Sequence, residues 1–161
     1  MTIALIPGSF APFHNGHLEV VERAADIFDE IVVAVLRNAQ KSEAMFDLDE
    51  RRDMIAESVA HIGRVRIVSM TTLLVNVAKE VNATCIVKGL RVVTDFESEL
   101  QMAQMNRSLS GIETLFLPAS SSRSFIASRL LREVARYGGD VSHFVPPAVE
   151  RRLKEKLGQE S

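Results

Sequence analysis

The chain has no tryptophan, one tyrosine and one cysteine among its 161 residues. A single thiol cannot form an intramolecular disulfide, so covalent cross-links are excluded as a source of stability. The cysteine, Cys85, lies in the apolar run TCIVKGL, with no activating side chain nearby in the sequence. This setting favours inert packing in a buried strand over a nucleophilic role.

A strong charge of either sign is also lacking. The net charge is −2 and the pI about 6.1, which gives no overall attraction to nucleic acids or to anionic membranes. No apolar run is long enough to span a bilayer, and the first residues, MTIALIPGSF, lack the basic start of a signal peptide. We therefore expect a cytoplasmic protein without nucleic-acid or membrane partners, although a balanced total can hide a local basic pocket.

Two common nucleotide-binding motifs are missing. No GxxxxGK[ST] occurs, which excludes a P-loop, and the first glycine-rich loop is not GxGxxG, which disfavours a nicotinamide dehydrogenase.

Short, almost continuous apolar runs alternate with helical patterns along the whole chain. Such runs are typical of strands in a parallel sheet covered on both faces. The sequence predicts one doubly wound, Rossmann-like α/β domain over residues 1–161, with a five-stranded parallel sheet. The expected strands are Thr2–Ile6, Ile31–Leu36, Val65–Ser69, Thr84–Val87 and Thr114–Leu117.

Helical periodicity fills the intervals between these runs. We expect helices beginning near Gly16 and at Asp47, the latter with a capping box to Glu50. Further helices are expected at about Leu73–Val81, Asp95–Leu109, Ser124–Tyr137 and a C-terminal segment of about 147–157. In the Asp95–Leu109 helix, the inward residues are expected to be Phe96, Leu100 and Ala103.

The loops after the strands carry most of the polar chemistry. GSFAPFHNGH (8–17) follows the first strand, Lys41 follows the second, Lys88 and Arg91 follow the fourth, and SSSRSFIASR (120–129) follows the fifth. In a doubly wound sheet these loops meet beyond the carboxyl ends of the strands. Together they predict a pocket for a polyanionic ligand.

The two histidines of the first loop allow three interpretations. His14 and His17 are three residues apart, as metal ligands can be, but no cysteine pair accompanies them. They can instead cap the helix or satisfy turn carbonyls. In the third interpretation, Gly8 and Gly16 permit close backbone approach, and free N–H groups of the first helical turn attract a phosphate.

The loops together resemble a known family. GSFAPFHNGH resembles the HxGH signature of the nucleotidyltransferase superfamily, and SRSFIASR resembles its second motif. KGLRVVTDFESELQMAQMN is similar to the phosphopantetheine adenylyltransferase family, and MFDLDER and EVARYGGDVSHFVP agree with it. The resemblance implies adenylyl transfer from ATP to 4'-phosphopantetheine, giving dephospho-coenzyme A and pyrophosphate, with Mg²⁺ accompanying ATP. It also implies a homohexamer.

Carried onto matching positions, the resemblance assigns His17 as the stabiliser of the transition state. It assigns ATP binding to Ser9, Phe10, His17, Gly89, Leu90, Arg91, Glu99, Arg123, Ser124, Phe125, Ile126, Ala127, Ser128 and Arg129. It assigns the second substrate to Ser9, Lys41, Leu74 and Lys88, and it gives the protein no metal ligands. Asp95 and Asn106 either face the pantetheine arm or serve as a helix cap and an exposed residue, respectively.

The chain departs from the family pattern at four positions. Ala11 replaces an aspartate, Ser98 a frequent tyrosine, and Ala127 and Arg129 the usual serines. These changes keep two alternatives open: transfer to another acceptor, such as nicotinamide mononucleotide or glycerol 3-phosphate with CTP, and nucleotide binding without catalysis.

Overall fold

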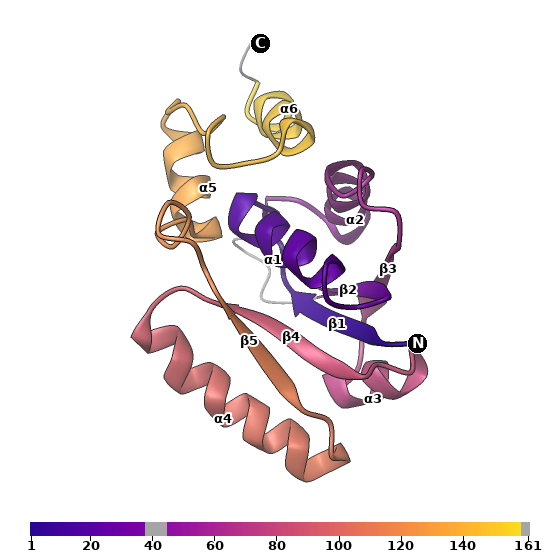
Figure 1. The fold of residues 1–161 in the computed structure, drawn as a ribbon. Coiled ribbons are helices and arrows are strands. Elements are labelled where there is room, and N and C mark those ends of the chain that lie inside the picture. The colour runs from indigo at the N-terminus through magenta and orange to yellow at the C-terminus, as the bar shows by residue number, and fades with distance from the viewer. Residues whose placement is uncertain (38–44, 159–161) are drawn as a thin grey trace.

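A computed structural model describes residues 1–37 and 45–158 of the chain. A five-stranded, fully parallel sheet runs through its centre in the order β3-β2-β1-β4-β5 (Figure 1). The strands are β1 (Ile3–Gly8), β2 (Glu30–Leu36), β3 (Val65–Met70), β4 (Cys85–Leu90) and β5 (Thr114–Pro118). The predicted doubly wound α/β fold is confirmed.

Helices connect successive strands and cover the sheet. They are α1 (Asn15–Ala25), α2 (Leu48–Ser58), α3 (Leu74–Glu80), α4 (Val93–Ser110), α5 (Ser128–Arg136) and α6 (Pro147–Lys156). In the part of the chain that the structure describes, none of the helices combines the length and the apolar character needed to cross a bilayer.

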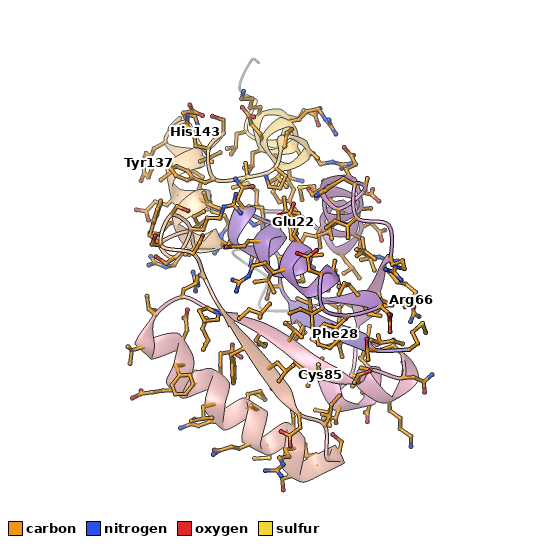
Figure 2. The ribbon with its side chains drawn as sticks, viewed as in Figure 1. Glu22, Phe28, Arg66, Cys85, Tyr137 and His143 are labelled. Carbon is orange, nitrogen blue, oxygen red and sulfur yellow. The ribbon has the colours of Figure 1, made fainter. Side chains whose placement is uncertain are left out.

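Alternate residues of each strand face opposite sides of the sheet, which creates two cores. Ala4 and Ile6 of β1 pack with α1, α2, α5 and α6, whereas Ile3 and Leu5 pack with α3. Cys85 belongs to the first core and is 5% exposed (Figure 2). Burial raises the pKa of its thiol, so the side chain is a protonated packing group, as expected.

The prediction for α4 was wrong about the face it buries. Phe96 and Leu100 were expected to point inward, but they are 42% and 36% exposed. The helix lies alongside the edge strand β5 (Figure 1), and the Phe96 ring meets the Phe116 ring edge-on, with centroids 6.0 Å apart. Asn106, in contrast, is only 6% exposed, so the alternative in which it is an exposed surface residue is wrong.

The start of α5 was also predicted too early. The helix begins at Ser128 and not at Ser124, because residues 121–125 form turns. In these turns the Ser124 hydroxyl donates to the Ser121 carbonyl at 3.2 Å. Serine side chains often bind nearby backbone in this way and favour turns over helix interiors.

Candidate active site

The strand order reverses between β1 and β4, because the chain moves to one side of β1 for β2 and β3 and to the other side for β4 and β5. Ligands of doubly wound folds bind at such a reversal, beyond the carboxyl ends of the strands. A cavity of about 500 Å³ lies there. Its walls come from the ends of β1 and β4, the first turns of α1, α4 and α5, and the loop after β5.

His14 and His17 form a capping box at the start of α1. The His14 Nδ1 accepts hydrogen bonds from the backbone N–H groups of Gly16, at 3.0 Å, and His17, at 3.3 Å. In return, the His17 Nδ1 accepts from the His14 N–H at 3.1 Å. The expected capping role is therefore present, and the first N–H groups of α1 are occupied within the protein. They are not the free phosphate donors that the sequence suggested.

The capping box also fixes the protonation of both rings. An Nδ1 atom that accepts a hydrogen bond carries no proton, so a neutral ring holds its proton on Nε2. Burial and the charge of Arg91 lower the pKa of His14 to about 3. Burial, His14 and Arg91 lower the pKa of His17 well below its usual value. His17 thus lines the cavity as a neutral ring whose remaining nitrogen, Nε2, is a hydrogen-bond donor.

Ring packing holds His17 in place. It stacks on His14, with ring centroids 3.6 Å apart, and meets the edge of Phe10 at 4.9 Å. Phe10 has a φ of +51°, which is uncommon for a residue other than glycine. A Cβ on Gly16 would lie only 2.8 Å from the His14 ring, so this glycine makes room for the capping imidazole.

Side chains from two helices, α2 and α5, hold the carbonyls of the loop before α1. The Ser128 hydroxyl donates to the Pro12 carbonyl at 2.8 Å, and Arg132 donates to the Ala11 carbonyl at 2.6 Å. Arg51 of α2 donates to the Ser9 carbonyl at 2.7 Å. The loop that carries His17 is therefore fixed from both sides.

Two cations of the cavity are paired with carboxylates of α4. Lys88 lies 2.8 Å from Glu99, and Arg91 lies 3.1 Å from Asp95. Arg91 also donates to the Ile126 carbonyl at 2.8 Å. Asp95 therefore acts as an ion-pair partner, whereas the N-cap of α4 is Val92.

The N-terminal region of α5 supplies the other cations. Arg123 and Arg129 line the cavity, and neither side chain has an ion-pair partner within residues 1–37 and 45–158. Among the residues that the structure describes, no side chain caps the N-terminus of α5. Its free N–H groups and the positive end of the helix dipole favour an anion at this point.

The structure brings most of the predicted site residues together. Those that line the cavity are Phe10, His17, Lys88, Gly89, Arg91, Glu99, Arg123, Ala127, Ser128 and Arg129. Those that do not are Ser9, Leu74, Leu90, Ser124, Phe125 and Ile126. Leu74 packs against the core that contains Ile3 and Leu5, and Lys41 lies outside the described residues.

Sequence reasoning missed the supporting arginines. Arg51 stands in the charged run DLDERRD, which is typical of a solvated helix face. Its helical spacing to Met54, Ile55 and Ser58 places it on the buried side of α2 and could have revealed it. No group of three or more histidine, cysteine, aspartate or glutamate side chains in the described part could hold a metal ion.

Comparisons with known proteins agree with this arrangement. A family model described as cytidylyltransferase-like matches residues 5–134. The phosphopantetheine adenylyltransferase of Streptomyces coelicolor is 50% identical over 157 residues, which are 98% of this chain and 98% of that protein.

Solved structures share the fold at low sequence identity. A bifunctional NMN adenylyltransferase/ADP-ribose pyrophosphatase from Francisella tularensis has a TM-score of 0.74 at 16% identity, covering 99% of this chain and 50% of that one. A protein from Vibrio parahaemolyticus, provisionally assigned as a nicotinate-nucleotide adenylyltransferase, has a TM-score of 0.70 at 18% identity. That match covers 100% of this chain and 98% of the other.

Proposed function

Because this chain belongs to the cytidylyltransferase-like family and, within it, to the phosphopantetheine adenylyltransferases, we propose that it transfers an adenylyl group from ATP to 4'-phosphopantetheine in coenzyme A synthesis. A phosphate oxygen of the acceptor attacks the α-phosphorus of ATP. The bond from that phosphorus to the bridging oxygen breaks, and pyrophosphate leaves with its electron pair. The products are dephospho-coenzyme A and pyrophosphate.

One observation carries the proposal: a neutral donor, four cations and an uncapped helix end line a single cavity at the strand-order reversal. The acceptor phosphate is already ionised, so this reaction needs no general base. The protein has to align two anions and stabilise the charge that develops on phosphate oxygens. These groups suit that task.

We assign His17 as the group that stabilises the transition state. Its Nε2–H donates to an oxygen of the α-phosphate while the Nδ1 atom stays in the capping box. A donor fixed before the reaction needs no reorganisation when charge develops. The fixed tautomer supports this role, because the donor atom does not depend on a ring flip.

The remaining assignments follow the family resemblance, and lining of the cavity supports those of Lys88, Arg91, Arg123 and Arg129. Lys88, with Ser9, Lys41 and Leu74, serves the acceptor, and Arg91, Arg123 and Arg129 serve the triphosphate with the residues of the Arg123–Arg129 stretch. Lys88 and Arg91 exchange their carboxylate partners, Glu99 and Asp95, for phosphate oxygens when substrates bind. No group of acidic, histidine or cysteine side chains among the described residues could hold a metal ion, so Mg²⁺ would be held by the phosphates of ATP and would supply charge neutralisation for the departing pyrophosphate.

An acceptor panel tests the proposal. Purified protein with MgATP should release pyrophosphate and form dephospho-coenzyme A, identified by mass, with 4'-phosphopantetheine. Nicotinamide mononucleotide and glycerol 3-phosphate, the latter also with CTP, are the comparison acceptors. Turnover with one of these alone, or nucleotide binding without turnover for every acceptor, would contradict the proposal.

We also propose that the chain assembles, with a homohexamer as the expected form. An apolar surface on α4 supports this, and its exposed members are Val93, Phe96, Leu100, Met102, Met105 and Leu109. Leu115 of the edge strand β5 is also 48% exposed. Large amounts of exposed apolar surface are typical of interaction sites in water-soluble proteins.

A further inference from the structure

Arg51 is the only arginine, lysine, aspartate or glutamate that is buried within residues 1–37 and 45–158. Its side chain is on the inner face of α2, and the residue is 4% exposed. Moving a guanidinium out of water costs free energy, which must be offset by well-made hydrogen bonds. The arrangement of those bonds indicates what the buried cation does.

Arg51 donates to the backbone of three separate segments. Its Nη1 reaches the Ser9 carbonyl at 2.7 Å and the Leu36 carbonyl at 2.8 Å, and its Nε reaches the Asp47 carbonyl at 3.2 Å. Leu36 ends β2, and Asp47 caps α2. One side chain thus connects the loop after β1 to the end of the neighbouring strand and to the helix that follows it.

The Ser9 carbonyl is a sensitive point in that loop. A peptide group is planar, so holding the Ser9 carbonyl toward Arg51 turns the Phe10 N–H the opposite way. Phe10 adopts its positive φ at this peptide and lines the cavity, where its ring packs against His17. The orientation of the Ser9–Phe10 peptide therefore influences both a loop amide and the position of the catalytic imidazole.

We propose that Arg51 is a positioning residue for adenylyl transfer, holding the Ser9–Phe10 peptide so that the loop and the His17 ring are in place before the substrates bind. The inference rests on the proposed function. Arg51 itself touches no substrate, because it does not line the cavity and its Nε and Nη1 atoms donate to backbone carbonyls. Its contribution acts through Phe10 and His17.

The test compares Arg51→Lys and Arg51→Gln with the matched variants Arg52→Lys and Arg52→Gln. Arg52 is the next residue, and its guanidinium contacts Ser69 and the Ile67 carbonyl of β3, away from the loop. All variants are checked for folding by circular dichroism, and kcat and KM for MgATP are measured well below the unfolding temperature. Lysine keeps the charge but cannot reach several carbonyls at fixed angles.

We expect kcat of both Arg51 variants to fall about 10- to 100-fold, as for a misplacement of reacting groups by about 1 Å, with a much smaller change in KM. The Arg52 variants should keep kcat near wild type. A purely structural role would lower the unfolding temperature and leave kcat of the folded protein unchanged. Wild-type kcat in folded Arg51→Lys would overturn the proposal, and so would unfolding of both Arg51 variants.

A second measurement does not depend on turnover. The imidazole ¹⁵N shifts of His17 in the ligand-free protein should show one tautomer in wild type and in Arg52→Lys, and a mixture in Arg51→Lys. An unchanged single tautomer in Arg51→Lys would contradict the proposal. If wild type makes no dephospho-coenzyme A, the proposed function fails, whereas these shifts still decide whether Arg51 positions the loop.

Discussion

At the scale of single residues, His14 and His17 have different roles, although the Nδ1 atom of each accepts a hydrogen bond from the backbone. His14 satisfies the N–H groups at the start of α1, and His17 returns one bond to the His14 backbone. Both rings are neutral near pH 7, because burial and nearby cations disfavour their protonated forms. A neutral His17 keeps one proton, on Nε2, for a phosphate oxygen.

Removing the His17 imidazole should therefore lower turnover and spare nucleotide binding. We expect kcat of His17→Ala and His17→Gln to fall by about 10²–10³, the usual effect of losing one transition-state donor. The glutamine variant can keep the capping box, since glutamine at this position accepts from the N-cap amide. Steady-state kinetics give kcat, and calorimetry with a nonhydrolysable ATP analogue gives affinity.

The control for this prediction is His61→Ala. His61 is exposed and pairs with Glu22 at 2.9 Å, outside the cavity, so its removal should leave kcat unchanged. If His17→Ala and His61→Ala have the same kcat, His17 has no catalytic role.

The lowered histidine pKa values also predict how stability changes with pH. The folded-state pKa of His14, about 3, is below its unfolded value of 6.5. Above pH 6.5 both states are neutral, so His14 adds no pH dependence. As the pH falls below 6.5, only the unfolded state takes up the proton, and the free energy of unfolding decreases by up to about 1.4 kcal/mol per pH unit for each such histidine.

Urea unfolding between about pH 7 and pH 5, where most carboxylates stay ionised, measures this slope. His14→Asn should have a shallower slope than wild type, because asparagine is a good N-cap and does not titrate. His143→Asn, at an exposed histidine, is the control. Equal slopes for His14→Asn and wild type would show that His14 is not the source.

At the scale of elements, the first turn of α1 depends on a missing side chain. A Cβ on Gly16 would lie 2.8 Å from the His14 Cε1 and 3.0 Å from its Nδ1, so Gly16→Ala should displace the capping ring. We expect a loss of about 1 kcal/mol in the free energy of unfolding, as when a helix loses its cap, and a fall in kcat because His17 is tied to the same box. Urea unfolding and initial rates measure both.

Gly63→Ala is the matched control, because a Cβ there meets nothing within 4 Å. It should unfold at the same urea concentration as wild type or a higher one, since alanine restricts the unfolded chain more than glycine does. A Gly16→Ala protein as stable and active as Gly63→Ala would show that the His14 cap tolerates displacement.

Some features of the strands and helices could be predicted from the sequence, and others could not. The strands were predictable because each is an apolar run, and the cavity followed because their carboxyl ends meet at one edge. The capping of α1 by His14 was predicted only as one alternative. The sequence of the loop is compatible both with free backbone N–H groups in the first turn and with N–H groups that a side chain caps. The buried face of α4 was mispredicted because an edge helix packs weakly, and Arg51 was missed because a charged run conceals a buried position.

At the scale of the whole molecule, a chain with a net charge of −2 still brings four cations to one cavity at the carboxyl ends of the strands. Lys88, Arg91, Arg123 and Arg129 share the cavity, whereas α4 provides carboxylates to two of them from its first turns. The same helix carries exposed apolar side chains along its length, from Val93 to Leu109. Assembly through α4 would therefore hold the helix whose carboxylates set the resting partners of Lys88 and Arg91.

This relation predicts the effect of a charge on that surface. Met105 is 57% exposed on α4, and Met105→Glu would place a carboxylate within an apolar interface, where an unpaired charge is costly. We expect Met105→Glu to have a smaller mass than wild type by size-exclusion chromatography with light scattering, and to stay folded because the residue is exposed. Ile27→Glu, at a 63% exposed apolar residue outside α4, should keep the wild-type mass. A wild-type mass equal to one chain, or an unchanged mass for Met105→Glu, would remove α4 as the assembly surface, because a contact that buries this helix cannot accept the new charge without weakening.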